Sequence, residues 1–312
     1  MSRKYASTPM AARSNLQQAV PISFGFKMAR LLATFQRHQQ RLKEILPRLL
    51  VIEFGGAAGT LATISETGLA FEVQEELAKE LGLNVPEIAW HTERDRIAEV
   101  GAFFALVTGT CSKFATDVKL LMQTEVGEVS EPYVPHRGSS STMPQKRNPI
   151  SSVYITAMAS TVRQLSSSLF DAMVEDHERS TGPWEIEWIV LPQIATMTHA
   201  TLMHTQELVE GLEVHPDAMK KNLELTKGAI VSEAVMMGLA KVLGRQVAHD
   251  LVYDLCRLAG ERHVPLVDLL SENEEIKKSK IGIEELEVLC DPANYLGLSE
   301  EMVCRVAGRS VE

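Results

Sequence analysis

The sequence predicts an all-α protein, and three observations support this fold class. Apolar residues recur at steps of three and four positions over long stretches, and no segment clearly alternates apolar and polar residues as a half-buried strand does. Prolines, which interrupt helices, mostly lie between the periodic stretches. With 312 residues, of which 45% are hydrophobic, the chain can bury a large interior, and we expect only minor sheet content.

The first predicted helix covers residues 24–46. Its apolar positions have helical spacing, polar and basic residues lie between them, and Pro47 is expected to end it. A longer helix is predicted over residues 93–126, whose apolar stripe contains no proline. Apolar side chains outside that stripe indicate contacts on more than one side, as in the centre of a bundle: Phe103, Leu106, Leu120 and Met122.

Four further helical patterns follow, at about residues 150–173, 185–212, 229–243 and 246–259. The patterns become shorter from Val264 onwards. We therefore expect two domains, a central helical bundle at residues 1–263 and a smaller C-terminal helical subdomain at residues 264–312.

Charge and cysteine usage exclude several classes of protein. The 31 Lys and Arg residues against 41 Asp and Glu give a net charge of -10, which argues against a basic surface for nucleic acid or an acidic membrane. No run of 18 apolar residues predicts a membrane span, and the first 12 residues lack the order of a secretory signal. The four cysteines show no CxxC spacing, so we predict no metal site and expect a reducing, cytoplasmic location.

The least ordinary segment is residues 137–149, which read R-G-S-S-S-T-M-P-Q-K-R-N-P. It combines adjacent hydroxyls with basic side chains, and Asn148 and Pro149 are expected at the N-cap and first position of the next helix. Free N–H groups at that helix start would suit a carboxylate or a developing oxyanion. By composition alone a flexible polar linker is an equally good interpretation.

The string at residues 139–149 resembles the signature loop of the fumarase/aspartase superfamily. The similarity runs roughly from Ala11 to Arg262, and further segments agree in the family's order: residues 17–21, 55–60, 94–96, 124–129 and 177–179. The resemblance implies a long-helix bundle that forms a homotetramer, with active sites shared between subunits. It also implies a substantial N-terminal domain before this region, which the sequence does not include.

The resemblance implies β-elimination, or its reverse, on a small polycarboxylate, without a metal or other cofactor. By motif position Ser140 is the general base, with Ser141 and Lys146 as further catalytic residues. A serine hydroxyl is a weak acid, so neighbouring cations and N–H donors would have to activate it. The residues implied to bind substrate are Ser14, Asn15, Gln18, Arg94, Thr142, Met143, Asn148, His177 and Arg179.

The His177-Glu178-Arg179 string is shared by adenylosuccinate lyases and by 3-carboxy-cis,cis-muconate cycloisomerases. Trp184, Glu185 and Trp188 stand where adenylosuccinate lyases have serines and a nucleotide-binding arginine, which favours the cycloisomerases. These tryptophans and Trp90 either surround a flat conjugated substrate or are large core residues. Without the resemblance, His177 and Arg179 would be interpreted as a charged helix face, and His91 as structural.

Two departures from the family pattern leave alternatives open. Asn15 stands where the family has an acid histidine, and asparagine cannot cycle a proton near neutral pH. Ser139 replaces the glycine that opens the loop. The first hypothesis is therefore a cycloisomerase, and the alternatives are an adenylosuccinate-type lyase that releases fumarate and a catalytically impaired structural paralogue. The glycine run at residues 55–59 lacks the ending of a phosphate-binding loop, so we reject nucleotide binding there.

Overall fold

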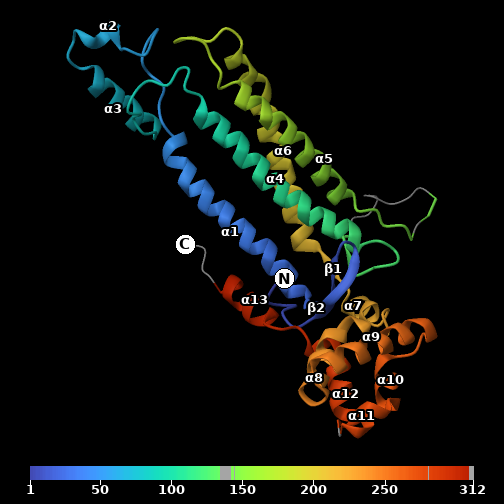
Figure 1. The fold of residues 1–312 in the computed structure, drawn as a ribbon. Coiled ribbons are helices and arrows are strands. Elements are labelled where there is room, and N and C mark those ends of the chain that lie inside the picture. Colours follow the sequence, from blue (N-terminus) through green and yellow to red (C-terminus); the bar gives the residue numbers. More distant parts are fainter. Residues whose placement is uncertain (134–141, 144, 280, 309–312) are drawn as a thin grey trace. The chain divides into compact units, whose positions relative to one another are not determined.

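The computed structural model describes residues 1–133, 142–143, 145–279 and 281–308. Contacts divide the chain into two compact units. Unit 1 contains Met1–Ala33, Leu121–Ser130 and Glu213–Glu312, and unit 2 contains Thr34–Leu120 and Glu131–Leu212. Both units are built mainly from helices (Figure 1), so the predicted all-α fold class is confirmed.

Unit 2 is a bundle of long helices. α1 (Phe24–Leu49) begins in unit 1 and continues into unit 2, where it runs beside α4 (Asp95–Leu121), and α5 (Ile150–Asp171) and α6 (Pro183–Gly211) pack as a helical hairpin (Figure 1). A buried cluster joins the last three of these helices through Ala98, Val162, Leu169, Val190 and Ile194. α4 and α5 approach closely at Gly101, where a Cβ atom would lie 2.5 Å from Leu169 Cδ1.

Two predicted helix ends differ from the structure. α1 continues to Leu49, so the prediction that Pro47 ends it was wrong. Only the last turn is affected, because the missing N–H of Pro47 removes one bond close to the helix end. α4 ends at Leu121 and not near residue 126, because the chain then turns through Gly127, which has a φ of 59°. By its length and composition alone α4 could cross a membrane, but the buried central helix of a bundle has the same length and composition.

Beyond α1, unit 2 contains two shorter helices, α2 (Ala62–Ser65) and α3 (Ala70–Leu81). The glycine-rich stretch at residues 55–59 precedes α2 and is not helical. Residues 82–94 connect α3 to α4. The predicted site residues of unit 2 lie in or beside the loops at the two ends of its long helices.

Unit 1 contains a β-hairpin that the sequence analysis did not predict. β1 (Pro9–Ser14) pairs with β2 (Gln17–Ser23) in antiparallel register, with Arg13 opposite Gln18 and Ser14 opposite Gln17. The connecting residues Asn15 and Leu16 have φ values of 51° and 64°, as a tight two-residue hairpin turn requires. The other sheet pairs β3 (Val129–Ser130) with β4 (Glu213–Val214), so the expected minor sheet content is confirmed.

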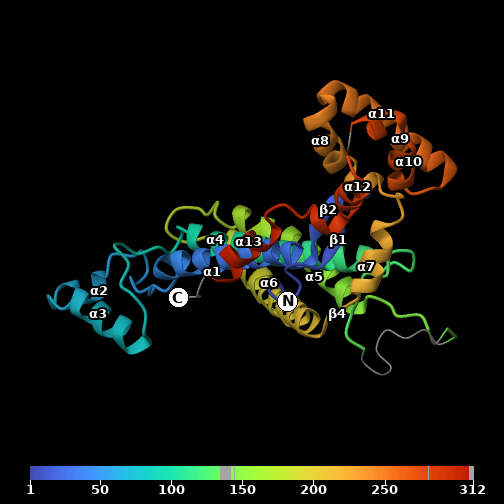
Figure 2. The same ribbon diagram turned by 90° about the horizontal axis from the view of Figure 1, so that it is seen from below.

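The rest of unit 1 is helical, and Figure 2 shows α8 to α12 gathered together. The elements after β4 are α7 (Pro216–Leu223), η1 (Ala229–Val231), α8 (Ser232–Leu243), α9 (Arg245–Arg262), α10 (Leu266–Glu272), α11 (Glu274–Lys278), α12 (Ile283–Cys290), η2 (Pro292–Asn294) and α13 (Ser299–Ala307).

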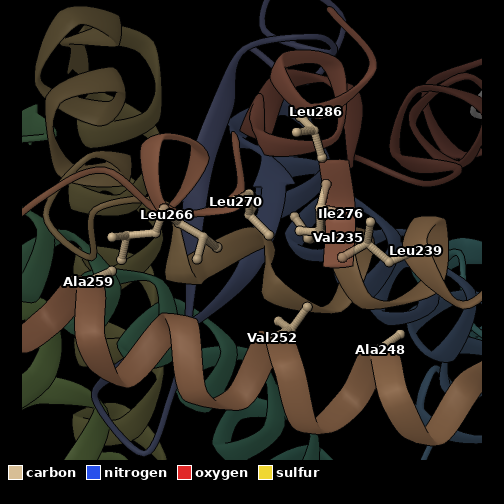
Figure 3. Close-up of a cluster of buried hydrophobic side chains, with 10 residues drawn as sticks. Val235, Leu239, Ala248, Val252, Ala259, Leu266, Leu270, Ile276 and Leu286 are labelled. Atoms are coloured by element: carbon tan, nitrogen blue, oxygen red, sulfur yellow. The ribbon is translucent and has the colours of Figure 1, made fainter. Parts of the chain in front are cut away.

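Helices on both sides of residue 264 share one buried core in unit 1 (Figure 3). Val235, Leu239 and Val252 from α8 and α9 pack with Leu266 and Leu270 from α10. The division predicted at residues 263 and 264 therefore falls inside a compact unit, since the later helices bury their apolar faces against the earlier ones.

Candidate active site

The described site residues lie in three places. Ser14, Asn15 and Gln18 belong to the hairpin of unit 1. The other two groups belong to unit 2: Thr142, Met143, Lys146 and Asn148 precede α5, while Arg94, His177 and Arg179 lie at the other end of the long helices. Ser140 and Ser141 lie outside the described residues, so their predicted roles stay predictions.

The start of α5 is capped by Glu131. Pro149 occupies the N-cap position and Ile150 is the first helical residue, so the prediction of Asn148 as N-cap and Pro149 as first residue was wrong. The Glu131 carboxylate accepts from the Ser151 and Ser152 N–H groups at 3.0 and 2.8 Å. Those N–H groups were expected to be free for a carboxylate or oxyanion, and they are instead occupied by the protein's own carboxylate.

The end of the signature segment presents positive charge beside this cap. Lys146 and Arg147 are exposed, and Asn148 is half-buried immediately before the helix. The Lys146 N–H donates to the Met143 carbonyl at 3.0 Å, which forms a turn between two predicted site residues. Exposed cations at this position suit an anionic ligand.

Arg94, at the start of α4, is held by a glutamate of α6. Its Nε and Nη2 donate to the two carboxylate oxygens of Glu187 at 2.9 and 2.6 Å, and both side chains are largely buried. Burial by itself lowers the pKa of Arg94, but the hydrogen bond and charge of Glu187 raise it overall. Since this ion pair already engages the guanidinium, a contact between Arg94 and substrate stays a prediction.

Three loops meet around the His177–Arg179 segment. The Thr92 hydroxyl donates to the His177 carbonyl at 3.0 Å, and Arg179 Nη2 donates to the Ala57 carbonyl at 3.2 Å. The glycine-rich stretch is closely packed here, because a Cβ atom on Gly59 would lie 2.8 Å from Ala89 Cβ. The segments 55–60 and 177–179, which the motif analysis selected separately, are therefore neighbours in unit 2, and Thr92, two residues before the 94–96 segment, also contacts them.

The aromatic residues near these loops differ in exposure. Trp90 is buried and its Nε1 donates to the Ile52 carbonyl at 2.8 Å, so it fits the core interpretation. Glu53 accepts from the Trp90 N–H at 2.7 Å and contacts His91 Nδ1 at 3.1 Å, which gives His91 a structural partner. Trp184 and Trp188 pack edge to face with ring centres 5.1 Å apart, and Trp188 is 61% exposed.

A buried ion pair supports the hairpin in unit 1. Arg13 donates to both carboxylate oxygens of Glu128, and Asn222 Nδ2 donates to Glu128 Oε1 at 2.8 Å. Gln18 Nε2 donates to the Asn222 carbonyl at 2.8 Å. A cavity of about 340 Å³ adjoins these groups and is lined by Arg13, Leu16, Gln17, Gln18, Glu125, Val126, Asn222, Leu225 and Thr226.

The strand register separates Gln18 from Ser14. Residues directly opposite in an antiparallel pair share a face, while neighbours along a strand face opposite ways. Gln17 therefore shares a face with Ser14, whereas Gln18 shares one with Arg13. Gln17, which the sequence analysis did not select, thus lies on the face of Ser14, and the roles predicted for Ser14 and Gln18 stay predictions.

The two groups of site residues in unit 2 lie far apart within one chain. Asn148 precedes α5 and His177 follows it, and the 22 residues of α5 at about 1.5 Å each span about 33 Å. A small polycarboxylate is much shorter than this distance. One copy of unit 2 therefore cannot place Lys146 and His177 on the same substrate molecule.

This architecture, a bundle of long helices with a hydroxyl-rich and basic segment ahead of one of them, is that of a class of lyases. Residues 1–163 match the family described as lyase, and residues 228–306 match the family described as adenylosuccinate lyase C-terminus. The chain belongs to the fumarase/aspartase superfamily, as its motifs predict.

Similarity to individual proteins covers nearly the whole chain. It is 59% identical to trans-aconitate decarboxylase 1 of Mycosarcoma maydis, over 99% of this chain and 62% of that protein. It is 47% identical to the 3-carboxy-cis,cis-muconate cycloisomerase of Pseudomonas aeruginosa, over 97% and 66%. The crystal structure of the 3-carboxy-cis,cis-muconate lactonizing enzyme from Pseudomonas putida superposes with a TM-score of 0.91 at 42% identity, over 98% and 67%. The chain thus spans about two thirds of the length of these relatives.

Proposed function

We propose that the chain carries out addition and elimination on a small unsaturated polycarboxylate, as 3-carboxy-cis,cis-muconate cycloisomerases do. The observation that carries this proposal is the signature segment, whose described end presents Lys146 and Asn148 at the start of α5. The 47% identity to a cycloisomerase and the tryptophans of the 184–188 stretch favour this substrate class over a nucleotide.

The proposed chemistry is a proton-coupled ring closure. An oxygen of one substrate carboxylate forms a bond to an alkene carbon, and the electron pair of the double bond moves to the adjacent carbon beside another carboxylate. That carbon takes the proton of the Ser140 hydroxyl, and the serine regains a proton from water. In the reverse direction Ser140 removes the proton, while Ser141, Lys146 and Asn148 hold the developing negative charge.

We further infer a homotetramer whose active sites draw residues from several copies. The span of α5 supports this assembly, because Lys146 and His177 of one copy of unit 2 cannot meet on one substrate. In this proposal one copy supplies the signature segment, and other copies supply His177 with Arg179 and Ser14 with Asn15. Analytical ultracentrifugation gives the direct measurement, and an active monomer would contradict the assembly.

A second candidate reaction is decarboxylation of an unsaturated tricarboxylate. The 59% identity to a trans-aconitate decarboxylase favours it, and this substrate has the same chemical class as a carboxymuconate. In that reaction a carbon–carbon bond to one carboxylate breaks, carbon dioxide leaves, and the remaining carbanion takes a proton from the enzyme. Asn15 would be retained there as a hydrogen-bonding residue, because an asparagine cannot supply that proton.

Turnover on a panel of substrates distinguishes these functions. Loss of ultraviolet absorption from 3-carboxy-cis,cis-muconate supports the cycloisomerase, carbon dioxide from trans-aconitate supports the decarboxylase, and fumarate from adenylosuccinate would support the lyase alternative. We expect Ser140→Ala to lower kcat by about 10²–10⁴-fold, the usual contribution of general acid–base catalysis. Ser167→Ala, at an exposed serine within α5, is the control. Full activity of Ser140→Ala would contradict the mechanism, and a folded tetramer inactive on all three would favour the structural paralogue.

A further inference from the structure

The carboxylate of Glu131 is built into the N-terminus of α5. It accepts from the Ser151 N–H at 3.0 Å, the Ser152 N–H at 2.8 Å and the Ser152 hydroxyl at 2.7 Å. Glu131 is only 7% exposed, so these donors replace the water that a carboxylate otherwise binds. A negative charge at this position also interacts favourably with the helix dipole.

The backbone of Glu131 contacts the same region through a second interaction. Arg147 Nη2 donates to the Glu131 carbonyl, and the Arg147 guanidinium lies 5.9 Å from the centre of the Tyr133 ring. Glu131 therefore contacts this region twice, because its side chain holds the first turn of α5 and its main chain holds Arg147. Both contacts involve residues within six positions of Lys146, which is in the signature segment.

We propose that Glu131 is the positioning residue of the signature segment. Its carboxylate fixes the first turn of α5, and its carbonyl fixes Arg147, so Asn148 lies between two anchored points and Lys146 directly precedes the first of them. Glu131 acts through these residues and does not contact substrate. The effect of Glu131 on catalysis rests on the proposed function, whereas its anchoring of Arg147 and of the first turn of α5 does not.

The anchoring is tested without turnover. Glu131→Ala removes three accepted hydrogen bonds, and Ser152→Ala removes one of them. We expect the Ser151 and Ser152 amides to exchange hydrogen about tenfold faster in Glu131→Ala, which corresponds to loss of a typical cap. Trypsin cleavage after Lys146 and Arg147 should accelerate in the same order, with Ser152→Ala between wild type and Glu131→Ala.

Asn273→Ala provides a matched control. Asn273 Oδ1 caps α11 by accepting from the Glu275 and Ile276 N–H groups, so its loss also removes a two-amide cap. It lies in unit 1, whereas Glu131 lies in unit 2. We expect Asn273→Ala to leave exchange at Ser151 and cleavage after Lys146 unchanged. Equal exchange and cleavage in wild type and Glu131→Ala would overturn the proposal.

The kinetic measurement addresses the positioning. At a temperature where each variant is folded, Glu131→Ala should lower kcat by about 10²-fold, because a displacement of about 1 Å at a reacting group has that effect. Asn273→Ala should keep the wild-type kcat. If Glu131→Ala loosens the segment but keeps the wild-type kcat, the positioning role is wrong. If wild type turns over no polycarboxylate, the proposed function fails, and exchange and cleavage still decide the anchoring.

Discussion

Arg13 and Glu128 form a two-point ion pair beneath the hairpin of unit 1. Arg13 Nη1 lies 2.9 Å from Glu128 Oε2 and Nη2 lies 2.7 Å from Oε1, and the glutamate side chain is completely buried. Arg13 is adjacent to Ser14, which begins the tip of the hairpin. The ion pair thereby connects the strand that carries Ser14 to the turn before β3.

Arg13→Met should destabilise the protein by about 3–5 kcal/mol, because it leaves the Glu128 carboxylate buried without its charged partner. Urea denaturation measures this change. Arg257→Met is the matched control, since Arg257 pairs with Glu261 on the surface of the same unit and should contribute no more than about 1 kcal/mol. Similar effects of the two substitutions would contradict the interpretation of the buried pair.

Arg94→Lys should lower stability although it keeps the charge. A lysine ammonium cannot donate two parallel hydrogen bonds to Glu187 as the guanidinium does, so we expect a loss of about 1–3 kcal/mol. Thermal denaturation is the measurement. Arg96→Lys is the control, because Arg96 also lies over the Trp90 ring, 5.1 Å from its centre, and a lysine keeps the charge there; its melting temperature should stay close to that of the wild type. A wild-type melting temperature for Arg94→Lys would disprove this prediction.

Glu175→Gln should stabilise the protein near neutral pH. Burial raises the pKa of Glu175, with Glu187, Asp176 and Glu185 also raising it and Arg94 opposing the change. Glu175 Oε1 is buried and makes no hydrogen bond within the described part of the chain. The folded state therefore holds the proton more tightly than the unfolded state, and wild-type stability falls as the pH rises through the ordinary carboxyl range.

The comparison of melting temperatures as a function of pH checks this sign. The gain from Glu175→Gln should be present at pH 7 and should shrink as the pH falls through the ordinary carboxyl range, below which the wild-type carboxyl is protonated in both states. Glu261→Gln, at an exposed glutamate paired on the surface, provides the control. A gain that does not change with pH would show that the charge of Glu175 is not its origin.

Cys290 should resist alkylation. Burial, together with the neighbouring Cys256, raises the pKa of Cys290 to about 11, so at pH 8 only about one thiol in a thousand is the reactive thiolate. Cys304 is exposed and should react first with iodoacetamide. Mass spectrometry of the modified peptides follows both sites in one sample, and equal labelling rates in the folded protein would contradict the burial argument.

The periodicity of apolar residues located the long helices because each of them buries a stripe of side chains. It did not locate the hairpin, because β1 and β2 are short and do not alternate cleanly between apolar and polar residues. Arg13, for example, is polar but points to the buried Glu128. It also missed Glu131, whose partners Ser151 and Ser152 lie about twenty residues away in the sequence. Local rules for helix caps consider only neighbouring residues, so they selected Asn148.

The motifs identified the superfamily, but the arrangement of the site needs the fold. Gln18 was selected by its place in a string, whereas the strand register assigns Gln17 to the face of Ser14. Likewise, the boundary at residue 264 was predicted because the helical patterns become shorter there. Leu266 and Val235 nevertheless lie in one buried cluster, which no local pattern predicts.

The length of α5 has a consequence for genetics. Under the proposed assembly, a copy damaged at Ser140 still offers an intact His177, and a copy damaged at His177 still offers an intact Ser140. Co-expression of Ser140→Ala and His177→Ala chains would thus rebuild some complete sites from two inactive parents. Two harmful alleles that strike opposite ends of this helix would compensate for one another, whereas two that strike the same end would not.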